Sequence, residues 1–212
     1  MRDNKTYLGK SIYMAAFLML GCSGSAGGCG SSEGGSTATI DSELLGVYQV
    51  DGYQGSEDNC DQPTDIDPAP DRLVLYSFLP NNNPDEALLG GTFCGSVDEC
   101  REVAKAASEP TIGYSFREGS DETGWLGWAI GRAGAMNDQC QADVQAHELT
   151  STSADAVRIE TKTFETVFPP FPPMPEEGSA VTCRNSDALA SLNPDLPCKA
   201  IIVLEATREA GL

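Results

Sequence analysis

The chain has 212 residues, of which 40% are hydrophobic and 21% are charged, so it suits one folded domain with additional segments and is not wholly disordered. It carries 13 Lys and Arg against 32 Asp and Glu, which gives a net charge of −19 at pH 7. Such an acidic chain repels nucleic acid and anionic headgroups. It excludes a nucleic-acid partner and favours cationic partners and divalent metals.

The first segment, residues 1–21, has the pattern of a secretory signal peptide. Three basic side chains within residues 1–10 precede an apolar run at residues 12–20. This run is too short for a bilayer span, which needs about 20 apolar residues. Later segments are also too short, so we expect no transmembrane helix in the mature chain.

Residues 19–22, with the sequence Met-Leu-Gly-Cys, resemble the lipobox of bacterial lipoproteins. In that family a signal peptidase cleaves before a cysteine that carries a diacylglycerol thioether. The resemblance covers residues 1–22 and implies that Cys22 is the lipid-attachment residue. It also implies a lipid anchor in the bacterial cell envelope, on the outer rather than the inner membrane, with the domain outside the cytoplasm. Ordinary signal cleavage among residues 23–28 is the alternative.

Residues 22–40 follow as a lipidated N-terminus and a linker rich in Gly, Ser, Ala and Thr. A flexible tether of this length has an r.m.s. reach of about 20–25 Å. We expect it to hold a single β-rich domain, residues 41–212, away from the headgroups. Cys29 lies in the tether, and the sequence gives it no evident partner.

Export places the remaining cysteines in an oxidising compartment, where cysteines form disulfides. Six of them allow 15 connectivities. We expect Cys94 to pair with Cys100 and Cys183 with Cys198, since each pair closes a short loop, which leaves Cys60 and Cys140 as a long-range third pair. The six candidates are Cys60, Cys94, Cys100, Cys140, Cys183 and Cys198. Zinc is disfavoured because Cys-x-x-Cys spacing is absent.

Eight segments of the domain have the length and apolar content of short β-strands. Turn residues separate them, so hairpin spacing predicts a mainly β domain, an antiparallel barrel or a sandwich. The first strand contains Gly46-Val47-Tyr48, which resembles the Gly-x-aromatic start of lipocalin-like barrels and implies a barrel. The predicted strands are 44–50, 73–79, 88–93, 111–116, 124–130, 140–148, 156–164 and 200–207.

Two short helices complete the domain. Ser96 and Glu99 form a capping-box pattern before an apolar face, which predicts a helix at 97–107. A second is predicted at 187–192. In the strand 140–148, alternation places His147 on the polar face, opposite the apolar residues, so we expect an exposed histidine.

Three aromatic residues are candidate ligand contacts: Trp125, Trp128 and Phe171. The two tryptophans are three residues apart in one strand and therefore face opposite sides. Phe171 belongs to a proline-rich stretch, 168–175, that is either a docking loop or a strap over one end of the domain.

The acidic loop 57–71 is the one candidate metal site. Oxygen ligands in a loop suit calcium, with Asp58, Asp61, Asp65 and Asp67 as the candidate ligands. The twelve-residue helix-loop-helix calcium pattern is absent, so a solvated loop is the alternative. We expect no other cofactor.

The motifs of common active sites are absent, and we assign no catalytic residue. There is no Gly-x-Ser-x-Gly, no dinucleotide fingerprint and no phosphate-binding loop. The sequence favours a non-enzymatic binding or interaction module in the envelope, whose partner is an envelope protein or a small ligand. The alternative is an envelope or extracellular hydrolase that uses carboxylate acid and base chemistry.

Overall fold

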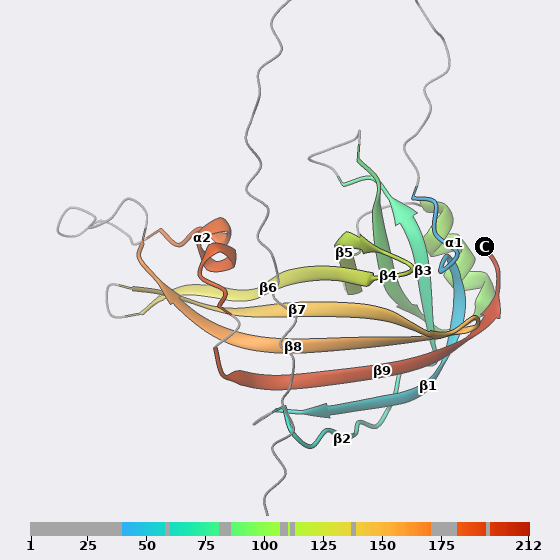
Figure 1. Ribbon diagram of the computed structural model, residues 1–212, viewed down its shortest axis with the longest axis horizontal. Helices are drawn as coiled ribbons and strands as arrows, with labels where there is room; N and C mark the ends of the chain where they lie inside the picture. The colour runs from blue at the N-terminus through green and yellow to red at the C-terminus, as the bar shows by residue number, and fades with distance from the viewer. Residues whose placement is uncertain are drawn as a thin grey trace, which may run out of the picture. The chain divides into compact units, whose positions relative to one another are not determined.

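The computed structural model describes residues 40–57, 60–80, 86–106, 110, 113–136, 139–170, 182–193 and 196–212. Figure 1 labels their helices and strands along the ribbon. In chain order the elements are β1 (Gly46–Ser56), β2 (Thr64–Asp65), β3 (Arg72–Phe78), β4 (Leu88–Cys94), α1 (Val97–Ala106), β5 (Gly113–Ser120), β6 (Gly124–Met136), β7 (Gln139–Ser153), β8 (Ala156–Phe168), α2 (Asn185–Ala190) and β9 (Cys198–Ala210).

Eight of the strands close into an antiparallel barrel. From β3 to β9 each strand pairs with the next one along the chain; β1 pairs with β3, and its pairing with β9 closes the ring. These are the eight strands that the sequence predicts, most of them longer than expected. Of the two predicted architectures, the barrel is therefore the correct one. The two-residue β2 adds to the edge of β1 at Gln54–Gly55.

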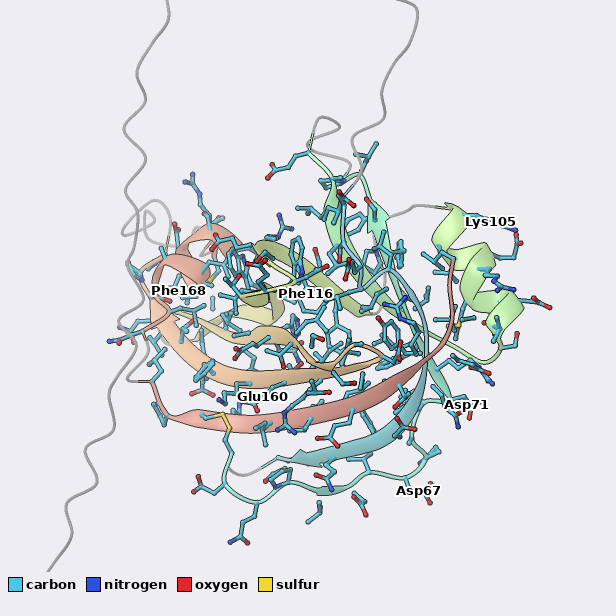
Figure 2. All side chains as sticks on the ribbon, turned by 45° about the vertical axis from the view of Figure 1, so that its right-hand side comes forward. Asp67, Asp71, Lys105, Phe116, Glu160 and Phe168 are labelled. Carbon is cyan, nitrogen blue, oxygen red and sulfur yellow. A yellow bond between two sulfur atoms is a disulfide. The ribbon has the colours of Figure 1, made fainter. Side chains whose placement is uncertain are left out.

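The main core lies on the inner wall of the barrel. Alternate residues of each strand point inward, and near one end of the barrel most of these are apolar. Phe116 is fully buried, and its ring stacks on Tyr114 with the centroids 6.0 Å apart. Figure 2 shows Phe116 among the side chains enclosed by the strands. The cluster contains Leu44, Tyr48, Leu73, Leu75, Leu89, Tyr114, Phe116, Leu149, Val157, Ile159, Leu204 and Ala206.

The segment before β1 closes this end of the barrel, which we call the plugged end. The backbone N–H of Glu43 donates to Asp121, in the turn between β5 and β6, at 2.7 Å. Arg208 of β9 donates to the Glu43 carbonyl oxygen and, at 2.9 Å, to that of Leu45. Its guanidinium lies 5.1 Å from the centroid of the Tyr48 ring. These bonds tie the segment to both sides of the barrel.

Helix α1 covers the outer face of β3 and confirms the predicted helix. The Ser96 hydroxyl accepts from the backbone N–H of Glu99 at 3.2 Å, and the Glu99 carboxylate accepts from the N–H of Gly95 at 2.9 Å. Val74, Tyr76 and Phe78 of β3 belong to the cluster that α1 helps to bury. Within the described part of the chain, no helix combines the length and hydropathy that a membrane span requires.

Helix α2, which starts two residues earlier than predicted, covers the outer face of the barrel wall at the other end. Strand β7 is therefore buried on both faces: Cys140, Ala142 and Val144 pack near α2, whereas His147 and Leu149 point into the barrel. The prediction that His147 is exposed is wrong, since only 4% of it is accessible. Alternation assigns it to the face opposite the apolar residues, but in a closed barrel that face is the interior.

Three disulfides join the six cysteines of the domain. The local bond between Cys94 and Cys100 is as the sequence predicts, but the predicted bonds of Cys183 with Cys198 and of Cys60 with Cys140 are wrong. Closure of the barrel explains the difference: β1 pairs with β9, with Ser56 opposite Ile201, so the chain leaving β1 lies beside the start of β9. The observed pairs are Cys60–Cys198, Cys94–Cys100 and Cys140–Cys183.

Because all six cysteines of the domain are paired, we expect none of them to react with a thiol reagent in the folded protein. Iodoacetamide under denaturing, non-reducing conditions should leave their peptides unmodified in a mass spectrum, and prior treatment with dithiothreitol should label all six. Peptides cross-linked as Cys60–Cys198 and Cys140–Cys183 should appear in the unreduced digest. A Cys183–Cys198 cross-link would contradict the closure of β1 on β9 described above.

Candidate functional site

The two ends of the barrel differ because its strands differ in length. Strands β6 to β9 have 13 to 15 residues, whereas β3, β4 and β5 have seven or eight. The pairs of β7 with β8 therefore continue to Cys140 and Phe168, past the shorter strands. We call this the open end. An eight-stranded barrel has an interior that side chains fill or that holds one small ligand.

A pocket of about 400 Å³ lies on the inner wall of the open end. Asp143 of β7 and Glu165 of β8 are directly opposite each other across the two strands, and both line the pocket. Lys199 of β9 places its Nζ 3.1 Å from a carboxylate oxygen of each. We call Asp143, Glu165 and Lys199 the mouth triad. The other lining residues are Gly134, Ala135, Gln141 and Ala142.

The charges of the mouth triad make the pocket a polar binding surface with a net negative charge. Hydrogen bonds to Asp143 and then Glu165 raise the pKa of Lys199, so its ammonium stays charged at neutral pH. The Lys199 side chain is 49% exposed, and ion pairs at such positions contribute little to stability. The ion pairs of the mouth triad therefore hold three charged groups in place but add little to the stability of the fold.

His147 lies deeper on the same wall, four residues along β7 from Asp143. Its Nδ1 is 2.9 Å from the hydroxyl oxygen of Thr161, and its ring meets the Tyr114 ring edge-on at 5.2 Å. Its Nε2 is buried and has no hydrogen-bond partner among the described residues. Burial lowers the pKa of His147 to about 4, so the imidazole is neutral at pH 7. An unpaired buried polar atom costs about 1–3 kcal/mol, which a ligand or a water molecule that bonds to it would recover.

A chain of aromatic rings packs against the main core and reaches His147 through Tyr114. Tyr53, Phe93 and Tyr114 come from three strands and meet edge to face, with centroids 6.3 Å and 5.9 Å apart. Burial raises the pKa of Tyr114, so its hydroxyl stays protonated and able to donate. The inner wall therefore carries aromatic rings, hydroxyl groups and one imidazole in addition to the charges of the mouth triad.

The two tryptophans lie on opposite faces of β6, as the sequence predicts. Trp125 packs against the inner core, and its Nε1 donates to Asp121 at the plugged end at 2.8 Å. Trp128 lies on the outer face, in a groove beside α2. Neither lines the mouth pocket. Phe171, the third predicted ligand contact, lies outside the described residues, as does Cys22, the predicted lipid-attachment residue.

Three of the four predicted calcium ligands lie in the segment between β1 and β3 and are exposed: Asp61, Asp65 and Asp67. Asp65 accepts a hydrogen bond from the Gln54 amide at 2.9 Å. Figure 2 shows Asp67 on the outside of the barrel, and Asp58 is not among the described residues. The described residues contain no group of three or more His, Cys, Asp or Glu arranged to hold a metal ion. Calcium binding stays a prediction.

Sequence reasoning missed most of the mouth. Asp143 is on the polar face of its predicted strand, but nothing in the sequence places Glu165 beside it or Lys199 between them. Glu165 lies one residue beyond the predicted strand end, and Lys199 one residue before the next predicted strand. The hairpin is the nearest signal in the sequence, but pairing outward from the turn at 154–155 brings Asp143 opposite Thr166. Only the register shift between Ser151 and Ser153 brings Asp143 opposite Glu165.

No protein-family model, no curated protein and no solved structure matches the chain.

Proposed function

We propose that the chain is a lipid-anchored protein of the bacterial cell envelope that binds a ligand at the open end of its barrel and does not transform it. The observation that carries this proposal is the mouth pocket, where Lys199 lies between Asp143 and Glu165. The plugged end leaves the open end as the way into the barrel. A small ligand at the mouth of such a barrel also agrees with the lipocalin-like Gly-x-Tyr of the first strand.

The ligand that best suits the mouth carries an amine. Two carboxylates face one ammonium, so the pocket keeps a net negative charge and has capacity for a second cation. The surrounding chain, with a net charge of −19, raises the local concentration of cations. A ligand amine would bond to Asp143 or Glu165 and displace Lys199 from one of them.

Isothermal titration calorimetry with putrescine, a small diamine, tests whether the mouth pocket binds an amine. We expect saturable binding at low salt. Asp143→Asn should weaken it about tenfold, because it removes one charged contact. Lys199→Met should strengthen it, because two facing carboxylates then lack a cation.

The matched control is Asp155→Asn, which changes the net charge equally but lies in the turn between β7 and β8 at the plugged end. Equal weakening by Asp143→Asn and Asp155→Asn would show that the amine is attracted to the acidic protein in general. That result would count against binding at the mouth pocket.

A hydrolase that uses Asp143 and Glu165 is the second candidate, because paired carboxylates serve glycoside hydrolysis. One of the pair must then donate a proton. An ammonium that bonds to both favours their ionised forms and fills the space between them. Lys199 therefore favours binding over acid catalysis.

The lipid anchor rests on the Met-Leu-Gly-Cys sequence at 19–22. We expect Cys22→Ala to release the protein from membranes, because the variant has no thiol to carry the diacylglycerol. Fractionation of cells into soluble and membrane material measures this, with Cys29→Ala as the control that stays with the membrane. A Cys22→Ala protein that still sediments with membranes would refute the anchor.

A further inference from the structure

Strand β6 separates from β5 part-way along its length. The two pair from Ser120 opposite Gly124 to Phe116 opposite Gly127, and there the pairing ends. Pairing of β6 with β7 continues on its other side as far as Met136. Among the described residues, no strand pairs with the β5-facing edge of β6 from Trp128 onward. Its backbone N–H and C=O groups there form an edge that can accept another strand.

A groove of about 610 Å³ opens where the two strands separate. Its apolar side consists of Trp128 and Ile130 of β6 and Leu189 of α2. On the β5 side lies the hydroxyl oxygen of Ser115, which is buried and has no hydrogen-bond partner among the described residues. The other lining residues are Pro110, Gly113, Arg117, Ala129, Asn185 and Ser186.

Arg117 gives this groove its charge. It is exposed, it lines the groove, and it forms no ion pair or hydrogen bond with the described residues. None of the described residues that line the groove is acidic. Every other basic side chain that the structure describes has a partner, as in the pairs of Arg72 with Glu209 and Arg158 with Glu205. In a chain with 32 acidic residues, an arginine without such a partner is an unfilled site for a carboxylate.

We propose that this groove binds an extended segment of a partner polypeptide, which pairs as a strand with the free edge of β6 and directs a carboxylate at Arg117. The free edge favours a polypeptide, because only a peptide backbone presents donors and acceptors at the spacing of a strand. Alternate side chains of the segment would face Trp128, Ile130 and Leu189 and are apolar. Ser115 offers its hydroxyl to a polar group of the segment. This site lies on the outer face and is separate from the mouth pocket.

The net charge of the chain restricts the segment further. A field from −19 charges repels a strongly acidic peptide, and Arg117 attracts a carboxylate only locally. The suitable segment therefore has one acidic residue in register with Arg117 and basic residues at its ends.

The test uses a fluorescent nine-residue peptide, Lys-Val-Thr-Glu-Thr-Val-Thr-Val-Lys, acetylated and amidated. Its glutamate takes a valine position, so that the carboxylate and the valines lie on the same face of the strand. Fluorescence anisotropy with the full chain should show saturable binding. Arg117→Gln should weaken binding of the peptide at least tenfold. Replacement of the peptide glutamate by glutamine should cause the same loss with the unchanged protein. The two changes together should weaken binding no more than either one alone. Arg101→Gln, which changes a half-buried arginine of α1 away from the groove, should leave the affinity unchanged.

Backbone pairing is tested by N-methylation of alternate peptide residues. Methyl groups on the set of amides that faces β6 should abolish binding, and methyl groups on the other set should leave it intact. Equal binding of both methylated peptides would overturn the strand addition. An unchanged affinity of Arg117→Gln for the peptide would overturn the carboxylate contact. Displacement of the peptide by acetate at equal concentration would overturn it as well. Formation of dimers of the chain in place of peptide binding would overturn the choice of a partner polypeptide.

Discussion

Replacement of Phe116 by alanine is expected to lower the free energy of unfolding by about 4 kcal/mol. Phe116 is fully buried on the inner wall of the barrel, where it stacks on Tyr114. Removing its ring leaves a cavity in the middle of the largest core cluster, and large-to-small changes of this kind typically cost about 3–5 kcal/mol. Urea unfolding followed by tryptophan fluorescence measures the loss.

Leu126→Ala is the control for this variant. Leu126 is an apolar residue of the neighbouring strand β6 on the outer face, and 43% of it is exposed. Its truncation should change the free energy of unfolding by less than about 0.5 kcal/mol. A loss at Phe116 no greater than the loss at Leu126 would mean that the barrel interior is not a packed core.

Acid is expected to destabilise the protein through His147, by about 3 kcal/mol between pH 7 and pH 4. Burial lowers the pKa of this histidine to about 4, whereas in the unfolded chain it is about 6.5. Between these values the unfolded chain binds a proton that the folded chain does not. Stability therefore falls as the pH drops through this window and is regained as the pH rises above 6.5.

His147→Phe isolates this contribution, since phenylalanine keeps the ring and cannot take up a proton. Urea unfolding at pH 7, 6, 5 and 4 should give a much flatter profile for the variant above pH 4. Below that pH, protonation of carboxylates such as Asp121 and Glu160, whose pKa values are lowered in the fold, should affect both proteins. Parallel profiles for the two proteins between pH 6.5 and pH 4 would contradict a buried, neutral His147.

The sequence was sufficient to predict the strands, but it did not predict that the first strand pairs with the last to close the barrel. Alternation and turn residues locate all eight strands, and the Ser96 and Glu99 pattern locates α1, because these signals are local. The pairing of β1 with β9 joins residues about 150 positions apart along the chain, as Tyr53 with Leu204 does. No local signal carries that contact, and two of the three disulfides depend on such long-range placement.

The site was less predictable than the fold for a related reason. A half-buried strand has one face in the core, so the polar face of 140–148 indicates exposure. In this barrel the polar face lines the interior, which places Asp143 at the mouth and His147 below it. Only the ring of strands, which brings Glu165 and Lys199 to Asp143, makes the mouth triad recognisable.

Chemical-shift mapping locates the ligand and so tests binding at the open end of the barrel. The ¹⁵N-labelled protein is titrated with putrescine in moderate salt, and each backbone amide is followed. We expect saturable shifts at Gly134, Gln141, Asp143, Glu165 and Lys199, with no change near Asp121 and Arg208 at the plugged end. Shifts spread evenly over the acidic surface, or confined to the plugged end, would contradict binding at the open end.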